Sequence, residues 1–132
     1  MREILFRGKR SDNGNWIEGH LFVRINDCFI IPLPIITSKS LVDGKTVGQF
    51  TGLKDKNGKK IFEGDICRFR EWSKGEMCWV GKVRWEHQQF MITGGPNKEC
   101  ETMFELCMSR FIPENIEVIG NIHDNPELLE NP

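Results

Sequence analysis

Residues 46–66 are divided into short apolar runs by four glycines, at positions 48, 52, 58 and 64. Within them, the sequence Asp-Lys-Asn-Gly at 55–58 predicts a β-hairpin, because Asn57 and Gly58 accept the positive φ that both central positions of a type I′ turn require. Gly64 and Asp65 predict a second turn that leads into a strand, with Asp65 bonding a nearby amide. We therefore interpret Asn57, Gly58, Gly64 and Asp65 as structural turn residues.

The first third of the chain alternates short apolar segments with turn signals. Apolar residues at 3–7 and 16–23 flank the turn-forming residues 11–15, and a third apolar segment at 28–31 ends at Pro32 and Pro34. This pattern predicts a β-meander. Residues 37–44 are polar and follow neither the helical nor the strand period, so they are interpreted as a variable loop.

The middle of the chain predicts a long hairpin. Residues 65–69 form its first strand, residues 71–76 its loop, and residues 77–85 its second strand, in which Met77, Trp79, Gly81, Val83 and Trp85 share a buried face. Gly81 on that face indicates a bulge or bend. A short third strand is predicted at 90–92. The order of strands and loops then resembles that of an SH3-like barrel, which is an analogy of pattern only.

The last third is less regular. Residues 98–110 fit both periods, and a strand followed by one helical turn is the preferred interpretation. Residues 116–122 predict a final strand, and Asn125 and Pro126 predict a short C-terminal helix at 127–130. The expected fold is mainly β: a small β-barrel with an N-terminal β-meander and a short C-terminal helix. We expect a single domain, 1–132, with the meander and loop in 1–45 and a barrel-like core in 46–132.

Composition limits the cellular location and the kinds of partner that we expect for the chain. The 132 residues carry 18 Lys and Arg against 19 Asp and Glu, so the whole molecule has no strong attraction for phosphate. No apolar stretch fits a signal peptide or a membrane span, which predicts a cytoplasmic protein with no membrane partner. The five cysteines are widely spaced and sit among apolar residues. They predict reduced core cysteines, with no disulfide, metal or cofactor.

Residues of the kinds used in catalysis are present but form no pattern. His20, His87 and His123 lie on predicted strands or turns. Asp124 follows His123, but neighbours on a strand point to opposite faces, so the sequence shows no partner within reach for acid–base chemistry. No glycine-rich nucleotide-binding loop occurs. The role of Asp65 in a turn is sufficient to explain that carboxylate. The sequence therefore predicts that the protein is not an enzyme.

Binding is the better-supported class of function. The predicted long hairpin concentrates cations around Trp72, and single-strand nucleic-acid binders interleave aromatic and basic residues in this way. Trp79 and Trp85 are assigned to the core, whereas Trp72 lies in a charged loop and is the preferred contact residue. The apolar segment 30–36 predicts a homo-oligomer that would cover it. The candidate binding residues are Trp72, Arg68, Arg70, Lys74, Lys82 and Arg84.

Three stretches also resemble the YopX family of phage and prophage proteins. They are the opening residues 1–8, residues 47–66, and the closing residues 116–128, in the order in which the family has them. The resemblance implies a small β-rich protein in a bacterial host cell and brings no catalytic residues. The expected function is that of a phage or prophage accessory protein acting as a non-enzymatic protein-interaction module, with a host or phage protein as partner. A nucleic-acid-binding β-barrel is the first alternative, and an uncharacterised enzyme is the second.

Overall fold

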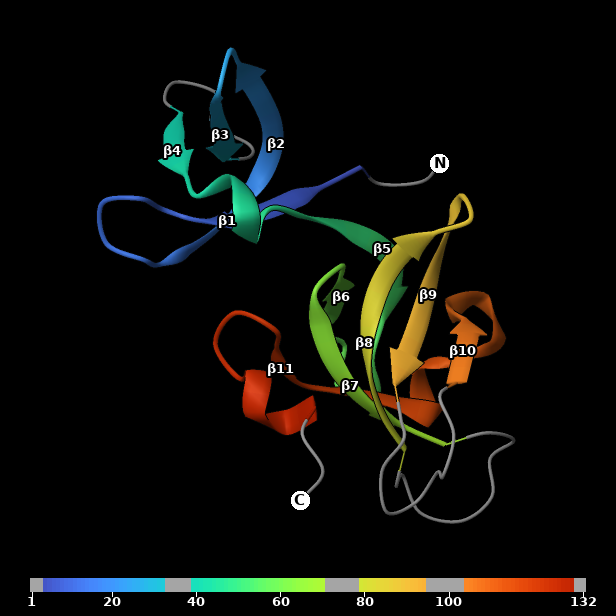
Figure 1. The fold of residues 1–132 in the computed structure, drawn as a ribbon. Helices are drawn as coiled ribbons and strands as arrows, with labels where there is room; N and C mark the ends of the chain where they lie inside the picture. The colour runs from blue at the N-terminus through green and yellow to red at the C-terminus, as the bar shows by residue number, and fades with distance from the viewer. Residues whose placement is uncertain (1–3, 33–38, 71–78, 95–103, 130–132) are drawn as a thin grey trace. The chain divides into compact units, whose positions relative to one another are not determined.

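The structure is a computed structural model that describes residues 4–32, 39–70, 79–94 and 104–129 (Figure 1). Its strands form two antiparallel sheets, with the orders β4-β3-β2-β1-β5-β6 and β10-β9-β8-β7-β11. The chain divides into two compact units, Met1–Gly52 and Leu53–Pro132. The mainly β prediction is confirmed. The predicted barrel is wrong for the described strands, which make two open sheets rather than a closed one.

The first unit begins with the predicted β-meander. Its strands are β1 (Phe6–Lys9), β2 (Trp16–Arg24), β3 (Asp27–Pro32) and β4 (Ser40–Val42). The loop interpretation of residues 37–44 is wrong for residues 40–42, because Ser40, Leu41 and Val42 pair with β3. The 3₁₀ turn η1 (Gly44–Thr46) follows. A neighbouring strand supplied by the tertiary fold outweighs the weak local period of this segment. Residues 37 and 38 lie outside the described residues.

The meander curls so that β4 meets the chain that follows β1. Arg10 bridges Val42, and the Ser11 amide donates to the Leu41 carbonyl at 2.9 Å. The concave side is apolar: Ile30 is fully buried, and a Cβ on Gly8 would lie 3.1 Å from the Val42 side chain. Glycine at position 8 therefore allows β1 and β4 to approach. Residues of opposite parity on these strands lie on the convex side, which we call the outer face.

Strands β5 (Gly48–Lys54) and β6 (Lys60–Phe62) flank the predicted hairpin turn. The turn is present, but its predicted type is wrong. Gly58 has φ +79°, whereas Asn57 is not among the described residues with positive φ, and the Gly58 amide donates to the Asp55 carbonyl at 3.0 Å. This geometry is a type I turn followed by one left-handed glycine, the usual three-residue hairpin loop.

The second unit contains the five-stranded sheet. It is built from β7 (Asp65–Phe69), β8 (Trp79–Glu86), β9 (Gln89–Gly94), β10 (Phe104–Cys107) and β11 (Ile116–Asn121). Its core includes the fully buried Ile61, Cys67, Phe69 and Ile92. The Phe69 ring contacts Phe111 edge-on, with 5.1 Å between centroids. These aromatic contacts fix the packing of β7 against the segment after β10.

Two details of the predicted long hairpin differ from the structure. Trp85 is not a core residue: it is 48% exposed and packs edge-on against Phe90 with centroids 4.7 Å apart. Gly81 makes no bulge, since it pairs in register with Cys67. The register shift lies instead in β11, between Val118 and Gly120. Alternation along one strand cannot show where the partner strand slips.

The C-terminal segments contain only 3₁₀ turns among the described residues. The preferred interpretation of 98–110 holds where the structure describes it, because β10 is followed by the turn η2 (Met108–Arg110). A second turn, η3 (Pro113–Asn115), precedes β11. The predicted C-terminal helix is wrong: η4 (Pro126–Leu129) is a single 3₁₀ turn, closed by a bond from the Leu128 amide to the Asn125 carbonyl. Four residues are too few to pay the nucleation cost of an α-helix.

Candidate functional site

A carboxylate that the sequence reasoning overlooked organises the hairpin turn. Asp55 is 2% exposed, and its Oδ1 accepts hydrogen bonds from the amides of Asn57 and Lys59, each at 2.9 Å. Its Oδ2 accepts from the Val118 amide of β11, also at 2.9 Å. One side chain thus joins the turn to the second sheet. The Asp-x-Asn-Gly pattern signalled the local bonds, but no local signal indicated the bond to residue 118.

Asp65 has the turn role that its position predicts. It is 1% exposed, and its Oδ2 accepts a hydrogen bond from the Phe62 amide at 2.7 Å. Gly64 has φ +94°, and its amide donates to the Val83 carbonyl at 2.9 Å. The turn therefore connects β6 to β7 and at the same time bonds to β8. A carboxylate used in catalysis has to reach a substrate, whereas Asp65 is buried. These contacts therefore indicate a structural role for Asp65.

The candidate binding residues of the long hairpin are only partly described. Trp72 and Lys74 lie outside the described residues. Arg70 is half-buried, and its Nε donates to the Asn115 side-chain oxygen at 3.1 Å, which gives it a structural contact. Arg68, Lys82 and Arg84 lie on one face of the second sheet, because Arg68 pairs with Val80, two residues from Lys82.

That face also carries carboxylates. Arg68 lies opposite Glu117 on β11, and Glu105 reaches the same face through its pairing with Thr93, which pairs with Lys82. Arg84 forms an ion pair with Glu86 at 3.3 Å. Cations and carboxylates therefore alternate across the sheet. A phosphate chain laid on this face would meet both signs of charge, so the arrangement offers little net electrostatic attraction.

One cluster of metal-ligand type occurs in the described part of the chain. Glu86, His87 and Glu105 each bring one ligand atom within 4.8 Å of the others. His87 and Gln88 form the two-residue turn between β8 and β9, with φ of +55° and +64°. The His87 side chain is 71% exposed and Arg84 already pairs with Glu86. Water competes for these ligands, so we assign no metal to them.

The other candidate nucleophiles and bases that the structure describes lie on different elements of the fold. His20 is exposed on β2, and His123 lies in the turn after β11. Cys28, Cys67 and Cys107 are free thiols, and Cys107 contacts Gln89 and Ser109 rather than a base. Cys78 and Cys100 lie outside the described residues. The expectation of a non-enzymatic protein therefore stays a prediction.

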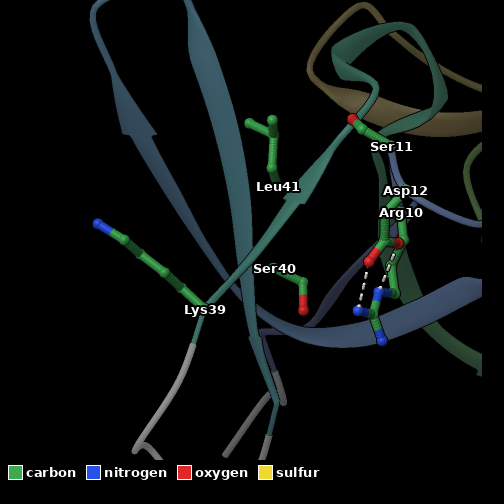
Figure 2. A pocket seen from close by; sticks show the side chains of 6 residues that line it. All are labelled: Arg10, Ser11, Asp12, Lys39, Ser40 and Leu41. Carbon is green, nitrogen blue, oxygen red and sulfur yellow. Dashed lines mark hydrogen bonds and ion pairs between the residues drawn. The ribbon is translucent and has the colours of Figure 1, made fainter.

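A pocket of about 330 Å³ lies in the first unit, beside the start of β4 (Figure 2). It is lined by Arg10, Ser11, Asp12, Lys39, Ser40 and Leu41. The Arg10 guanidinium is held by Asp12 through Nε at 3.1 Å and a second nitrogen at 2.8 Å. Lys39 points away from this pair (Figure 2). The two cations do not converge, so the pocket lacks the paired donors of an anion site.

The outer face of the meander gathers aromatic side chains with cations. Register places Phe22, Phe29 and Leu41 side by side across β2, β3 and β4. The Lys39 Nζ lies 5.0 Å from the Phe22 ring centroid and 4.6 Å from that of Phe29. Further along β2, Trp16 on the same face is contacted by Arg7 and Lys9, at 4.6 and 5.5 Å from its centroid. The sequence reasoning sought this combination in the long hairpin.

The tip of the β2–β3 hairpin is a second exposed surface of the first unit. Val23 is 57% exposed and Ile25 is 88% exposed; we call these two residues the hairpin tip. Ile25 has φ +53°, a left-handed conformation that a β-branched residue rarely adopts. By contrast, the segment 30–36, which suggested an oligomer interface, begins inside β3. Ile30 there is core, and residues 33–36 lie outside the described residues.

None of the helical segments in the described part of the chain has the length and apolar character that a membrane crossing needs.

Comparisons with known proteins add a family and one structural neighbour. The family model described as YopX protein matches residues 5–130. The crystal structure of protein EF1440 from Enterococcus faecalis is similar, with a TM-score of 0.56 and 25% sequence identity, over 98% of this chain and 100% of that chain. A search of the curated proteins finds no match. Since the family model spans nearly the whole sequence, the resemblance seen in the three sequence stretches is confirmed, and the chain belongs to the YopX protein family.

Proposed function

We propose that this chain is a non-enzymatic protein-interaction module and that its partner binds at the hairpin tip. The observation that carries this proposal is Ile25, which is 88% exposed with φ +53°. A β-branched residue in this conformation costs about 1–3 kcal/mol, and glycine or asparagine would occupy it with less strain. The exposed side chain gains nothing for the fold. The two-residue turn between Arg24 and Asp27 requires the positive φ but not an isoleucine. A strained and exposed aliphatic side chain at such a position is typical of a functional residue.

The chemistry of the tip supports a protein as the partner. Val23 and Ile25 present aliphatic carbon, which has neither a hydrogen-bonding group nor a ring on which a base could stack. Covering such groups removes apolar surface from water, as in the centre of protein interfaces. The predicted homo-oligomer is one form of this proposal, with a second copy as the partner. Family membership supports the further proposal that the protein is a phage or prophage accessory factor in the bacterial cytoplasm.

Site-specific photo-crosslinking in bacterial cells tests the proposal. A benzophenone amino acid is placed at position 25 and, as a matched control, at position 112, where Ile112 of the second unit is 51% exposed. We expect a discrete protein adduct from position 25 that is absent from position 112. Mass spectrometry then identifies the adduct as a second copy or as another protein. Equal labelling from both positions, or none from position 25, would refute a partner at the tip.

Light scattering addresses the oligomer directly. A second copy at the tip predicts a mass above the 15.3 kDa of one chain, which returns to that value in Ile25→Gly. A monomer at all micromolar concentrations, combined with a heterologous adduct, identifies another protein as the partner. Ile25→Gly is suitable because glycine relieves the strain at the same time as it removes the side chain. Loss of the higher mass in that variant therefore does not arise from unfolding.

A further inference from the structure

We propose that the outer face of the meander is a binding site for single-stranded nucleic acid. The site goes beyond the protein-interaction function and is separate from the hairpin tip, because Val23 has the opposite parity to Phe22 on β2. The bases of the nucleic acid would stack on Trp16, Phe22 and Phe29. Its phosphates would contact Lys39 and Arg24, which flank those rings.

The geometry provides two stacking platforms on one face. Phe22 and Phe29 are a direct cross-strand pair, with ring centroids 6.0 Å apart and planes tilted by 41°. Trp16 lies six residues before Phe22 on β2, about 20 Å away at about 3.3 Å per residue. Both positions have the same parity and therefore face the same way. This spacing suits an extended strand of a few nucleotides rather than a single base.

Cations outnumber carboxylates around these stacking platforms. Lys39 lies over both Phe rings, and Arg24 is exposed two residues beyond Phe22 on the same face. Neither forms an ion pair with any residue that the structure describes. The carboxylates of this face are Glu18, opposite Arg7, and Asp27, opposite Arg24.

Charge is also segregated between the two units. Residues 1–52 contain seven Lys and Arg against five Asp and Glu, a formal charge of +2, whereas residues 53–132 contain eleven against fourteen, a formal charge of −3. The net charge of −1 for the whole chain conceals this difference. An anionic polymer is therefore drawn to the unit that carries Trp16, Phe22 and Phe29. Aromatic faces beside unpaired cations are the combination that single-strand binders use.

The test is fluorescence anisotropy with the full chain and fluorescein-labelled oligo(dT) of about 12 nucleotides, a length within the usual site sizes. A duplex of the same length is the comparison ligand. Titrations at about 50 and 200 mM salt measure the electrostatic share of binding. We expect binding to the single strand that weakens with salt, and weaker binding to the duplex, whose bases cannot stack on the rings. No binding at low salt, or tighter binding to the duplex, would overturn the proposal.

Variants separate stacking from simple apolar contact. Phe22→Leu and Phe29→Leu keep an apolar side chain but remove the ring, and each should weaken binding by about 5- to 150-fold. Lys39→Gln should lower the slope of log affinity against log salt by about 0.7, the value for one phosphate contact on a single strand. Unchanged affinity in both Leu variants would refute stacking and leave a protein as the occupant of this face.

Two controls keep the result independent of the protein-interaction proposal. Arg68→Gln removes an exposed cation from the mixed-charge face of the second unit and should leave the affinity unchanged. Ile25→Gly removes the Ile25 side chain from the hairpin tip, and this variant should also bind oligo(dT) normally. Loss of oligonucleotide binding in Arg68→Gln would place the site on the second sheet instead. Loss in Ile25→Gly would show that the two surfaces are one site.

Discussion

The buried carboxylate of Asp55 offers the sharpest test of how this fold is held together. Asp55→Ala removes two acceptor oxygens that together accept three hydrogen bonds, leaving the amides of Asn57, Lys59 and Val118 without their bonds. A hydrogen bond to a charged group contributes about 1.5–3 kcal/mol, and losses within one network are not additive. With the side chain 2% exposed, water cannot easily replace the lost acceptors. We expect a decrease of about 3–5 kcal/mol in the free energy of unfolding.

Asp55→Asn distinguishes the hydrogen bonds that Oδ1 accepts from the one that Oδ2 accepts. The amide oxygen can still accept from Asn57 and Lys59, but the amide nitrogen then faces the Val118 N–H, donor against donor. We expect a smaller loss, about 1–3 kcal/mol. Urea unfolding followed by circular dichroism and tryptophan fluorescence measures both variants, and agreement of the two probes checks two-state behaviour.

Asp12→Ala is the matched control, since the Asp12 side chain is 65% exposed and pairs with Arg10 in a surface ion pair. Its effect should stay within about 1 kcal/mol. If Asp55→Ala also stays within about 1 kcal/mol of wild type, the carboxylate does not hold β11 to the turn. If Asp55→Asn and Asp55→Ala are equally destabilised, the local turn bonds contribute nothing of their own.

Three further substitutions test the backbone geometry, each measured by urea unfolding. Ile25→Gly should raise the free energy of unfolding by about 1 kcal/mol, because it relieves the left-handed strain at φ +53°; a decrease would show that Ile25 is not strained. Gly58→Ala should cost about 1–2 kcal/mol at φ +79°, and no cost would contradict the turn type. Gly19→Ala places a Cβ 2.0 Å from the Ile31 carbonyl oxygen and should cost about 3 kcal/mol or more; tolerance would show that β2 and β3 pair differently.

Local patterns predicted the presence of most elements but not their details. The hairpin at 55–58 was evident because Asn-Gly punctuates two apolar runs, yet the type I turn depends on the Asp55 bonds that favour a right-handed Asn57. Likewise, alternation in residues 77–85 predicted a strand. It could not show that Trp85 lies near the strand end, where it is half exposed and packs on Phe90.

The sequence predicted the fold better than it predicted the position of the candidate binding surface. Aromatic and basic residues that are close in sequence predicted a site around Trp72, which lies outside the described residues. The combination on the outer face is assembled from β1, β2, β3 and the residue before β4, with Lys39 and Phe22 seventeen positions apart. Cross-strand neighbours have no fixed sequence spacing, so no linear motif marks them.

The sequence by itself determined the family, the β-rich class, the meander and the turn roles of Gly58, Gly64 and Asp65, because these depend on local backbone preference and short apolar runs. Only the tertiary structure decided that β4 forms, that β11 slips its register at Val118, and that the described strands make two open sheets. Each of these depends on which strands become neighbours. Strand pairing is a long-range choice, made by the total burial and hydrogen bonding of the fold rather than by any one segment.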